Sequence, residues 1–198
     1  SKDRTWDIIT ALHHEHTCIE GLRLSRNRGH QNALLAGLMT AKEFCDCAIS
    51  VDADLQDDIE VLDQFVDAYH NGNEIVYGVR NKRDTDSFFK KFTALGFYKF
   101  MKLLGADIIY NHADYRLCSR KVLEALSEFR EVNLFLRGVV PLIGYRSTTV
   151  TYDRNKRFAG VSKYPLKKML SFALDGITSF SVKPLKLISN LGLGISLC

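Results

Sequence analysis

A short apolar run that ends in a cluster of acids constrains the fold of this chain more than any other feature. Residues 47–51 read Cys-Ala-Ile-Ser-Val, and Asp52-Ala53-Asp54-Leu55-Gln56-Asp57 follows at once. An apolar run of this length is typical of a strand that is covered on both faces of a sheet. In open α/β sheets, ligands bind beyond the carboxyl ends of the strands. We therefore expect the chemistry of this protein at the end of this strand.

Strand-like and helix-like segments alternate along the whole chain. Helical spacing of apolar residues covers 5–16, 30–42, 61–69, 87–104, 119–129 and 134–143, and strand-like runs cover 19–24, 47–51, 74–79, 115–118 and 145–152. This order predicts an α/β fold with a mostly parallel sheet flanked by helices. A length of 198 residues suits one domain, or one domain plus a short appendage.

Composition and charge exclude several classes of protein. The chain is 46% hydrophobic and 25% charged with a net charge of +4, which is typical of a globular protein and gives no reason to expect a nucleic acid partner. Its five cysteines have no framework-like spacing, so we interpret them as reduced thiols. A Rossmann-type dehydrogenase is disfavoured because the Gly-x-Gly-x-x-Gly fingerprint does not occur.

The acidic cluster has a pattern that suits a divalent cation. Asp52 and Asp54 are separated by one residue directly after a strand, so both carboxylates can reach one hard cation. Mg²⁺ and Mn²⁺ are commonly held by few protein oxygens together with phosphate oxygens. The alternative is a polar loop in which Asp57 or Asp58 caps the next helix.

Further motifs occur in a fixed order on both sides of this cluster. Together they resemble the family-two glycosyltransferases of the polyprenyl-phosphate type, which include dolichol-phosphate mannosyltransferases and bactoprenol glucosyltransferases. The matching segments are residues 25–31 (Ser-Arg-Asn-Arg-Gly-His-Gln), 52–57, 77–80 (Tyr-Gly-Val-Arg), 114–117 (Asp-Tyr-Arg-Leu), 157–163 (Arg-Phe-Ala-Gly-Val-Ser-Lys) and 175–181 (Asp-Gly-Ile-Thr-Ser-Phe-Ser). The likeness covers nearly the whole chain.

The resemblance implies a GT-A fold and the inverting transfer of a hexose from a nucleotide-diphosphate sugar to a polyprenyl phosphate. It places three groups of side chains in the site. These are Asp52, Asp54 and Gln56 for Mg²⁺ or Mn²⁺ and the donor diphosphate, Arg157 and Lys163 closing over the phosphates, and Arg80, Lys90 and Lys91 for the acceptor phosphate. The base and the sugar are not named by any motif, so UDP-glucose is expected first and GDP-mannose next.

Asp114 matches the aspartate of the family's Asp-Phe-Arg-Leu motif, with Tyr115 in place of the phenylalanine. With Asp54, it is the candidate catalytic residue. Three roles stay open for Asp114: it orients the sugar or acceptor, it acts as a general base, or it is a structural acid that pairs with Arg116.

The ends of the chain suggest a piece of a longer protein. Residues 1–163 are expected to form the catalytic domain, with the family's N-terminal strands missing. Residues 164–198 mix apolar and lysine residues and predict amphipathic juxtamembrane helices that lead into a transmembrane segment. We therefore expect a protein at the cytoplasmic face of the membrane, in contact with the membrane surface and anchored by transmembrane helices beyond residue 198.

Two other functions compete with this one. A family-two enzyme that glycosylates a saccharide or protein hydroxyl would need a general base. A non-catalytic module would bind only a nucleotide sugar or an anionic lipid. A homo-oligomer is possible under each of these functions, including the leading one.

Overall fold

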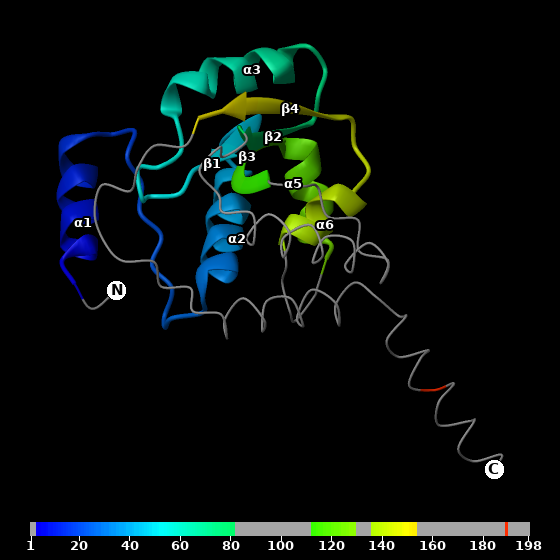
Figure 1. The fold of residues 1–198 in the computed structure, drawn as a ribbon. Helices are drawn as coiled ribbons and strands as arrows, with labels where there is room; N and C mark the ends of the chain where they lie inside the picture. The colour runs from blue at the N-terminus through cyan, green and yellow to red at the C-terminus, as the bar shows by residue number, and fades with distance from the viewer. Residues whose placement is uncertain (1–2, 82–111, 130–135, 154–188, 190–198) are drawn as a thin grey trace, which may run out of the picture.

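The computed structural model describes residues 3–81, 112–129, 136–153 and 189 (Figure 1). The helices are α1 (Thr5–Glu15), α2 (His30–Ala41), the short 3-10 helix η1 (Ile59–Val61), α3 (Leu62–His70), α5 (Arg120–Ser127) and α6 (Leu136–Leu142), and the strands are β1 (Cys47–Ser50), β2 (Ile75–Arg80), β3 (His112–Ser119) and β4 (Ser147–Tyr152). The predicted α/β fold is confirmed. The helix expected over 87–104 lies outside the described residues.

Local sequence signals account for where several elements begin. The side chain of Asp58 accepts a hydrogen bond from the backbone N–H of Glu60 at the start of η1. The hydroxyl of Ser119 accepts from the backbone N–H of Val122 at the start of α5, as its position before the helix predicts. The strand expected over 19–24 does not form, and this segment is irregular.

The sheet is mixed rather than mostly parallel in its pairing. Its order is β1-β3-β2-β4, with β3 antiparallel to both of its neighbours and β2 parallel to β4. The direction of a strand is set by its partner strands and not by its own apolar pattern. The pattern of residues 115–118 therefore could not predict the direction of β3. Because β3 runs against β1, β2 and β4, its first residues lie at the edge where the other three strands end.

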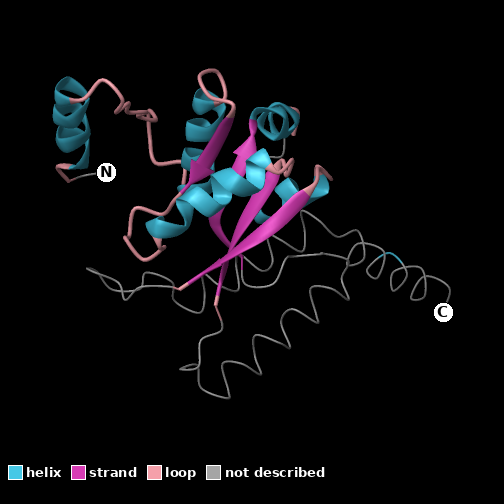
Figure 2. Ribbon diagram, turned by 90° about the horizontal axis from the view of Figure 1, so that it is seen from above, coloured by secondary structure: helices cyan, strands magenta, loops and turns pink. Residues whose placement is uncertain are grey.

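Helices cover both faces of this sheet (Figure 2). Side chains of α2, α5 and α6 pack against one face, around the buried Leu123, Leu126 and Val139. Helix α3 covers the other face, where Phe65 stacks on Tyr115 with ring centroids 4.7 Å apart. Helix α1 has no buried residue and stands apart from these layers in both views.

The expected anchoring by transmembrane helices is wrong for the part of the chain that the structure describes, because no helix there is long and apolar enough to cross a bilayer. Residues 164–188 and 190–198, for which juxtamembrane helices were expected, lie outside the described residues.

Gly78 in β2 allows two tyrosines to pack closely over the sheet. A Cβ atom at this position would lie 2.9 Å from the backbone oxygen of Tyr115 and 3.1 Å from Cε1 of Tyr152. The first contact is with backbone and cannot be relieved by a side-chain rotation. Gly78 is therefore required by packing rather than by backbone conformation.

Replacing Gly78 by Ala is expected to lower the free energy of unfolding by about 1–3 kcal/mol, the usual cost of overpacking a core. Gly37→Ala is the matched control, because a Cβ there meets nothing within 4 Å. This glycine lies inside α2, so its replacement should stabilise the protein by about 0.5–1 kcal/mol. Urea unfolding of both variants measures the difference, and equal effects would contradict the packing argument.

Candidate active site

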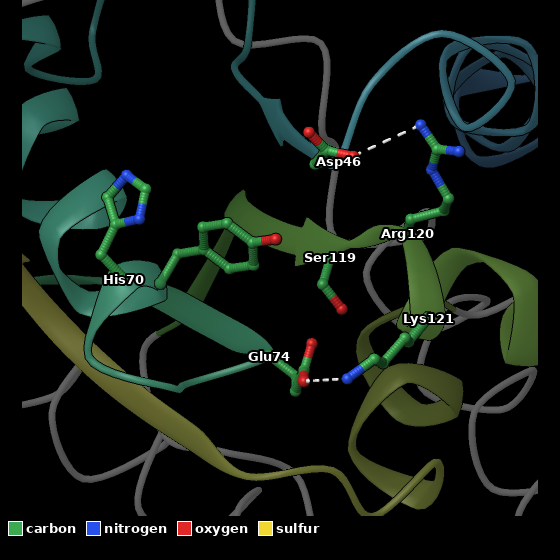
Figure 3. A pocket seen from close by; sticks show the side chains of 7 residues that line it. Asp46, His70, Glu74, Ser119, Arg120 and Lys121 are labelled. Atoms are coloured by element: carbon green, nitrogen blue, oxygen red, sulfur yellow. Dashed lines mark hydrogen bonds and ion pairs between the residues drawn. The ribbon is translucent and has the colours of Figure 1, made fainter.

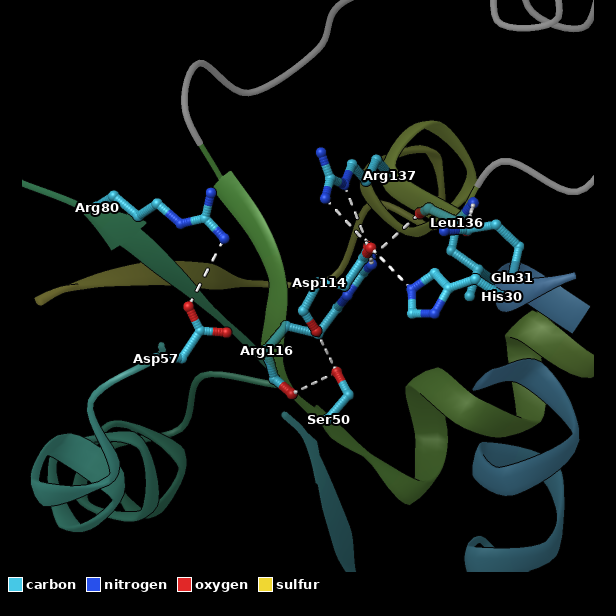
Figure 4. A network of polar contacts seen from close by, with 9 residues as sticks. All are labelled: His30, Gln31, Ser50, Asp57, Arg80, Asp114, Arg116, Leu136 and Arg137. Atoms are coloured by element: carbon cyan, nitrogen blue, oxygen red, sulfur yellow. Dashed lines mark hydrogen bonds and ion pairs between the residues drawn. The ribbon is translucent and has the colours of Figure 1, made fainter. Parts of the chain in front are cut away.

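The carboxyl ends of β1, β2 and β4 and the start of β3 lie at one edge of the sheet. Figure 4 shows Asp57, Arg80 and Asp114 there. Asp52 follows β1, Arg80 ends β2, Asp114 lies near the start of β3, and Tyr152 ends β4. The parallel pairing of β2 with β4 places Arg80 opposite Tyr152. The topology therefore brings the acidic cluster and two motifs far apart in the sequence to one place.

Asp114 is the centre of a charged network. Its side chain is 6% exposed, and Nη2 of Arg116 donates to its Oδ1 at 2.6 Å. Arg137 from α6 donates from Nε to Oδ1 and from Nη2 to Oδ2, both at 3.2 Å. Nε2 of His30, at the start of α2, lies 3.3 Å from Oδ2. The hydroxyl of Ser50 donates to the backbone oxygen of Asp114.

These partners hold Asp114 in its ionised form. Burial alone would raise the pKa of Asp114, but the hydrogen bond from His30 and the charges of Arg137 and Arg116 outweigh it and hold the pKa well below its usual value. A carboxylate with so low a pKa is a weak base at neutral pH. The network suits positioning better than proton abstraction.

Arg116 is the buried cation of this network. Its Nη1 donates to the backbone oxygen of Leu136 at 3.2 Å, and the side chain of Gln31 accepts from the backbone N–H of the same residue at 3.1 Å. The first turn of α6, which carries Arg137, is thereby fixed against β3 and α2. The pairing of Asp114 with Arg116, one of the three roles left open by the sequence, is present.

The acidic loop, residues 51–58 between β1 and η1, concentrates negative charge. Burial raises the pKa of Asp52, and the nearby charges of Asp114, Asp57 and Asp54 raise it further. Asp54 is held by its own loop, since its Oδ1 accepts from the backbone N–H of Gln56 at 3.1 Å. A cation placed here would relieve the repulsion among these carboxylates.

Leu55 shows that the loop conformation is imposed by its surroundings. Its φ of 56° places a bulky residue in the left-handed region, and its side chain is exposed. That conformation costs about 1–2 kcal/mol for a residue with a Cβ. Such strain persists only where neighbouring interactions determine the backbone, and it gathers at functional sites.

The loop offers two carboxylates to a divalent cation. Within the described ranges, no group of three His, Cys, Asp or Glu side chains converges as a complete set of metal ligands. Mg²⁺ bound together with substrate phosphates needs only one or two protein carboxylates. Asp52 and Asp54, both partly exposed in a field of negative charge, meet that requirement.

A second charged cluster lies beside the loop. The hydroxyl of Tyr152 donates to Oδ1 of Asp57 at 2.5 Å, and Nε of Arg80 donates to the same hydroxyl at 3.2 Å. Nη2 of Arg80 lies 3.6 Å from Oδ1 of Asp57. Burial and the hydrogen bond to Asp57 raise the pKa of Tyr152 to about 12, so its hydroxyl keeps its proton.

Most of the predicted site residues come together, and the structure adds others. Asp52, Asp54, Gln56, Arg80 and Asp114 all lie at this edge, while the remaining predicted residues lie outside the described ranges: Lys90, Lys91, Arg157 and Lys163. Sequence reasoning assigned no individual role to His30, Arg137 or Tyr152, and it considered Asp57 individually only as a helix cap. The only signal for Arg137 was a lone charge inside an otherwise apolar helical segment.

His30 is expected to titrate above its usual pKa of about 6.5, because its hydrogen bond to Asp114 outweighs the effect of burial. For a raised folded-state pKa, the stability gained is fully present below about pH 6.5 and is lost as the pH rises through the folded value. NMR titration of His30 measures the pKa directly. The difference in the free energy of unfolding between wild type and His30→Gln should become smaller from pH 6 to pH 9. His14→Gln on α1 is the control and should show no such change. A pKa at or below 6.5 would contradict the hydrogen bond.

A separate surface depression of about 450 Å³ lies at the opposite edge of the sheet (Figure 3). Its cations face carboxylates, with Lys121 3.1 Å from Glu74 and Arg120 3.5 Å from Asp46. It lies away from the acidic loop, and its charges are satisfied within the protein.

A mixed sheet flanked by helices, with acids after β1 and an arginine at the end of β2 on one edge, agrees with the GT-A fold that the resemblance implied. The chain belongs to glycosyl transferase family 2, whose model matches residues 1–127. This is the family that the resemblance in the sequence implied.

Curated relatives agree with this assignment. The chain is 59% identical over 192 residues to the "Uncharacterized glycosyltransferase YkoT" of Bacillus subtilis, covering 97% of this chain and 57% of the relative. It is 39% identical over 197 residues to the "Bactoprenol glucosyl transferase" of Shigella phage SfV, covering 99% of this chain and 64% of that protein. The chain thus spans about three fifths of the length of these relatives.

Proposed function

We propose that this protein transfers a hexose from a nucleotide-diphosphate sugar to a polyprenyl phosphate, with inversion at the anomeric carbon. UDP-glucose is the first candidate donor and GDP-mannose the second. The name of the phage relative, a bactoprenol glucosyl transferase, supports both the lipid acceptor and glucose.

The state of Asp114 is the observation that carries the choice of acceptor. A sugar or protein hydroxyl must lose a proton as it attacks, and a general base for that step works best with a pKa near the operating pH. The pKa of Asp114 lies far below that range because burial is outweighed by His30, Arg137 and Arg116. A phosphate monoester is already ionised near neutral pH and attacks without such a base. The lowered pKa of Asp114 therefore favours a phosphate acceptor.

The acidic loop supplies the other half of the proposed reaction. Asp52, Asp54 and Gln56 would hold Mg²⁺ or Mn²⁺ against the donor diphosphate. When bound, the metal neutralises the negative charge that develops on the leaving nucleoside diphosphate. Arg157 and Lys163 are proposed to contribute positive charge to the same phosphates. Asp54 is fixed for this role by its hydrogen bond from the backbone of Gln56.

Arg80 is proposed to receive the acceptor phosphate, with Lys90 and Lys91 beside it. A guanidinium can donate two parallel hydrogen bonds to a phosphate, which orients the phosphate as well as attracting it. The side chain of Arg80 is 25% exposed at the edge that also carries the acidic loop, so its charge is within reach of a ligand. The attacking oxygen and the donor would then meet between β1 and β2.

The test is transfer of labelled sugar. Full-length protein is incubated with a polyprenyl phosphate, Mg²⁺ or Mn²⁺, and UDP-glucose, GDP-mannose or other labelled donors, and the lipid fraction is analysed. We expect a lipid-linked hexose whose formation stops with a chelator. Transfer to a saccharide or protein hydroxyl in place of the lipid would overturn the proposed acceptor. Donor binding without transfer or hydrolysis would indicate a non-catalytic module.

A further inference from the structure

The guanidinium of Arg80 contacts two buried side chains, Tyr152 and Asp57. The hydroxyl of Tyr152 accepts a hydrogen bond from Nε of Arg80 at 3.2 Å and donates one to Oδ1 of Asp57 at 2.5 Å. The same Oδ1 lies 3.6 Å from Nη2 of Arg80. The tyrosine hydroxyl therefore links the two groups, because it can accept a hydrogen bond from the guanidinium and donate one to the carboxylate at the same time.

The anchor is buried while the arginine remains partly accessible. The side chain of Asp57 is 1% exposed, and Tyr152 is also buried. The ring of Tyr152 packs edge-on against Tyr115, with centroids 5.2 Å apart, so it has little freedom to move. A guanidinium held by two buried groups is restricted in the orientations that it can adopt.

The anchor also connects the two halves of the site. Tyr152 is the register partner of Arg80 across the parallel strands β2 and β4. Asp57 belongs to the acidic loop and comes three residues after Asp54. Arg80 is thereby held by the same loop that carries the candidate metal ligands, which fixes its place relative to the donor side.

We propose that Tyr152 and Asp57 are positioning residues that hold the guanidinium of Arg80 in the orientation in which it meets its anionic ligand, the acceptor phosphate. This inference rests on the proposed function for the identity of that ligand. Neither residue needs to touch the substrate. A preorganised arginine binds an anion more tightly because less side-chain freedom is lost on binding.

Tyr152→Phe tests this inference, since it removes the hydroxyl and keeps the ring that packs on Tyr115. We expect KM for the polyprenyl phosphate to rise about tenfold, the range for losing a hydrogen bond to a charged group. The kcat and KM for the donor should change less than about twofold, because the Tyr152 hydroxyl bonds to Asp57 and Arg80 and not to the candidate metal ligands Asp52 and Asp54. Tyr145→Phe, an identical change at an exposed site outside this edge, is the control.

A double-mutant cycle separates positioning from a general loss of structure. If Tyr152 acts through Arg80, adding Tyr152→Phe to Arg80→Ala should change KM for the acceptor less than about twofold. The same tenfold rise in both backgrounds would overturn the inference. So would a fall in kcat and a rise in the donor KM that match the rise in the acceptor KM.

A measurement without lipid separates this inference from the proposed function. The Nε–H signal of Arg80 in arginine-selective ¹⁵N NMR is identified by its disappearance in Arg80→Ala. In Tyr152→Phe this signal should move and exchange faster with solvent, and an unchanged signal would overturn the anchor. If the signal responds but wild type transfers no hexose to polyprenyl phosphate, the proposed acceptor fails while the anchor of Arg80 is supported.

Discussion

Replacing Asp52 by Asn is expected to reduce sugar transfer at least about 100-fold while leaving the protein as stable as wild type or more stable. The loss of activity follows from the proposed metal site, because an amide oxygen is a weaker ligand for Mg²⁺ or Mn²⁺ than a carboxylate. Steady-state transfer assays across a metal titration measure it. The metal concentration at half-maximal activity should rise together with the fall in rate.

The effect of Asp52→Asn on stability has the opposite sign to its effect on activity. Burial and three neighbouring carboxylates raise the pKa of Asp52, so the folded protein disfavours its charge. For an acid with a raised folded-state pKa, ionisation destabilises the fold above that pKa, and the penalty disappears as the pH falls through it. The amide removes this penalty at pH 7. Thermal unfolding without metal should therefore give an equal or higher Tm.

Asp58→Asn is the matched control in the same loop. Asp58 caps η1 through its side chain, and Asn caps helices about as well as Asp does. Activity and metal dependence should stay within about twofold of wild type. Equal losses of activity in Asp52→Asn and Asp58→Asn would show that the substitutions disturb the loop conformation and do not remove a metal ligand. Unchanged metal dependence in Asp52→Asn would remove this residue from the proposed site.

Replacing Asp114 by Asn is expected to lower the free energy of unfolding by about 3–5 kcal/mol, the usual cost of breaking a buried ion pair from one side. The reason is Arg116, which is buried and donates to Asp114 at 2.6 Å. Without the carboxylate, its guanidinium is left in the interior with its charge uncompensated. A domain of ordinary stability, about 5–15 kcal/mol, loses roughly a fifth or more of its margin from such a change.

Urea unfolding measures this loss, and Asp67→Asn on the exposed side of α3 should change stability by less than about 0.5 kcal/mol. Adding Arg116→Met to Asp114→Asn should cost less than the sum of the two single changes, because both charges are then removed. Additive effects would contradict a direct charge pair.

The pH dependence of the same variant has a defined sign. The folded pKa of Asp114 is lowered because His30, Arg137 and Arg116 outweigh burial. Its stabilising effect is present above the unfolded value of about 3.9 and is lost as the pH falls through the folded value. Wild type should therefore lose stability below about pH 4 more steeply than Asp114→Asn does. Parallel curves would show that Asp114 is not held in its ionised form.

Much of the fold could be predicted from the sequence because the signals are local. The apolar run 47–51 predicted β1, and Ser119 predicted the start of α5, since each depends on residues a few positions apart. The family motifs likewise identified Asp52, Arg80 and Asp114. The prediction of a strand over 19–24 was wrong because three apolar residues among polar ones and a glycine do not distinguish a short strand from an irregular segment.

The sequence by itself determined the α/β class, the family and the acidic loop, because helix caps, strand periodicity and short motifs are written in neighbouring residues. Only the tertiary structure decided that β3 runs antiparallel to its neighbours and so brings Asp114 to the edge where β1 and β2 end. It also decided that Asp114 meets His30 from 84 positions away and that Tyr152 meets Asp57 from 95 positions away. Such contacts depend on strand direction and register, which arise from pairing between distant segments and leave no local pattern.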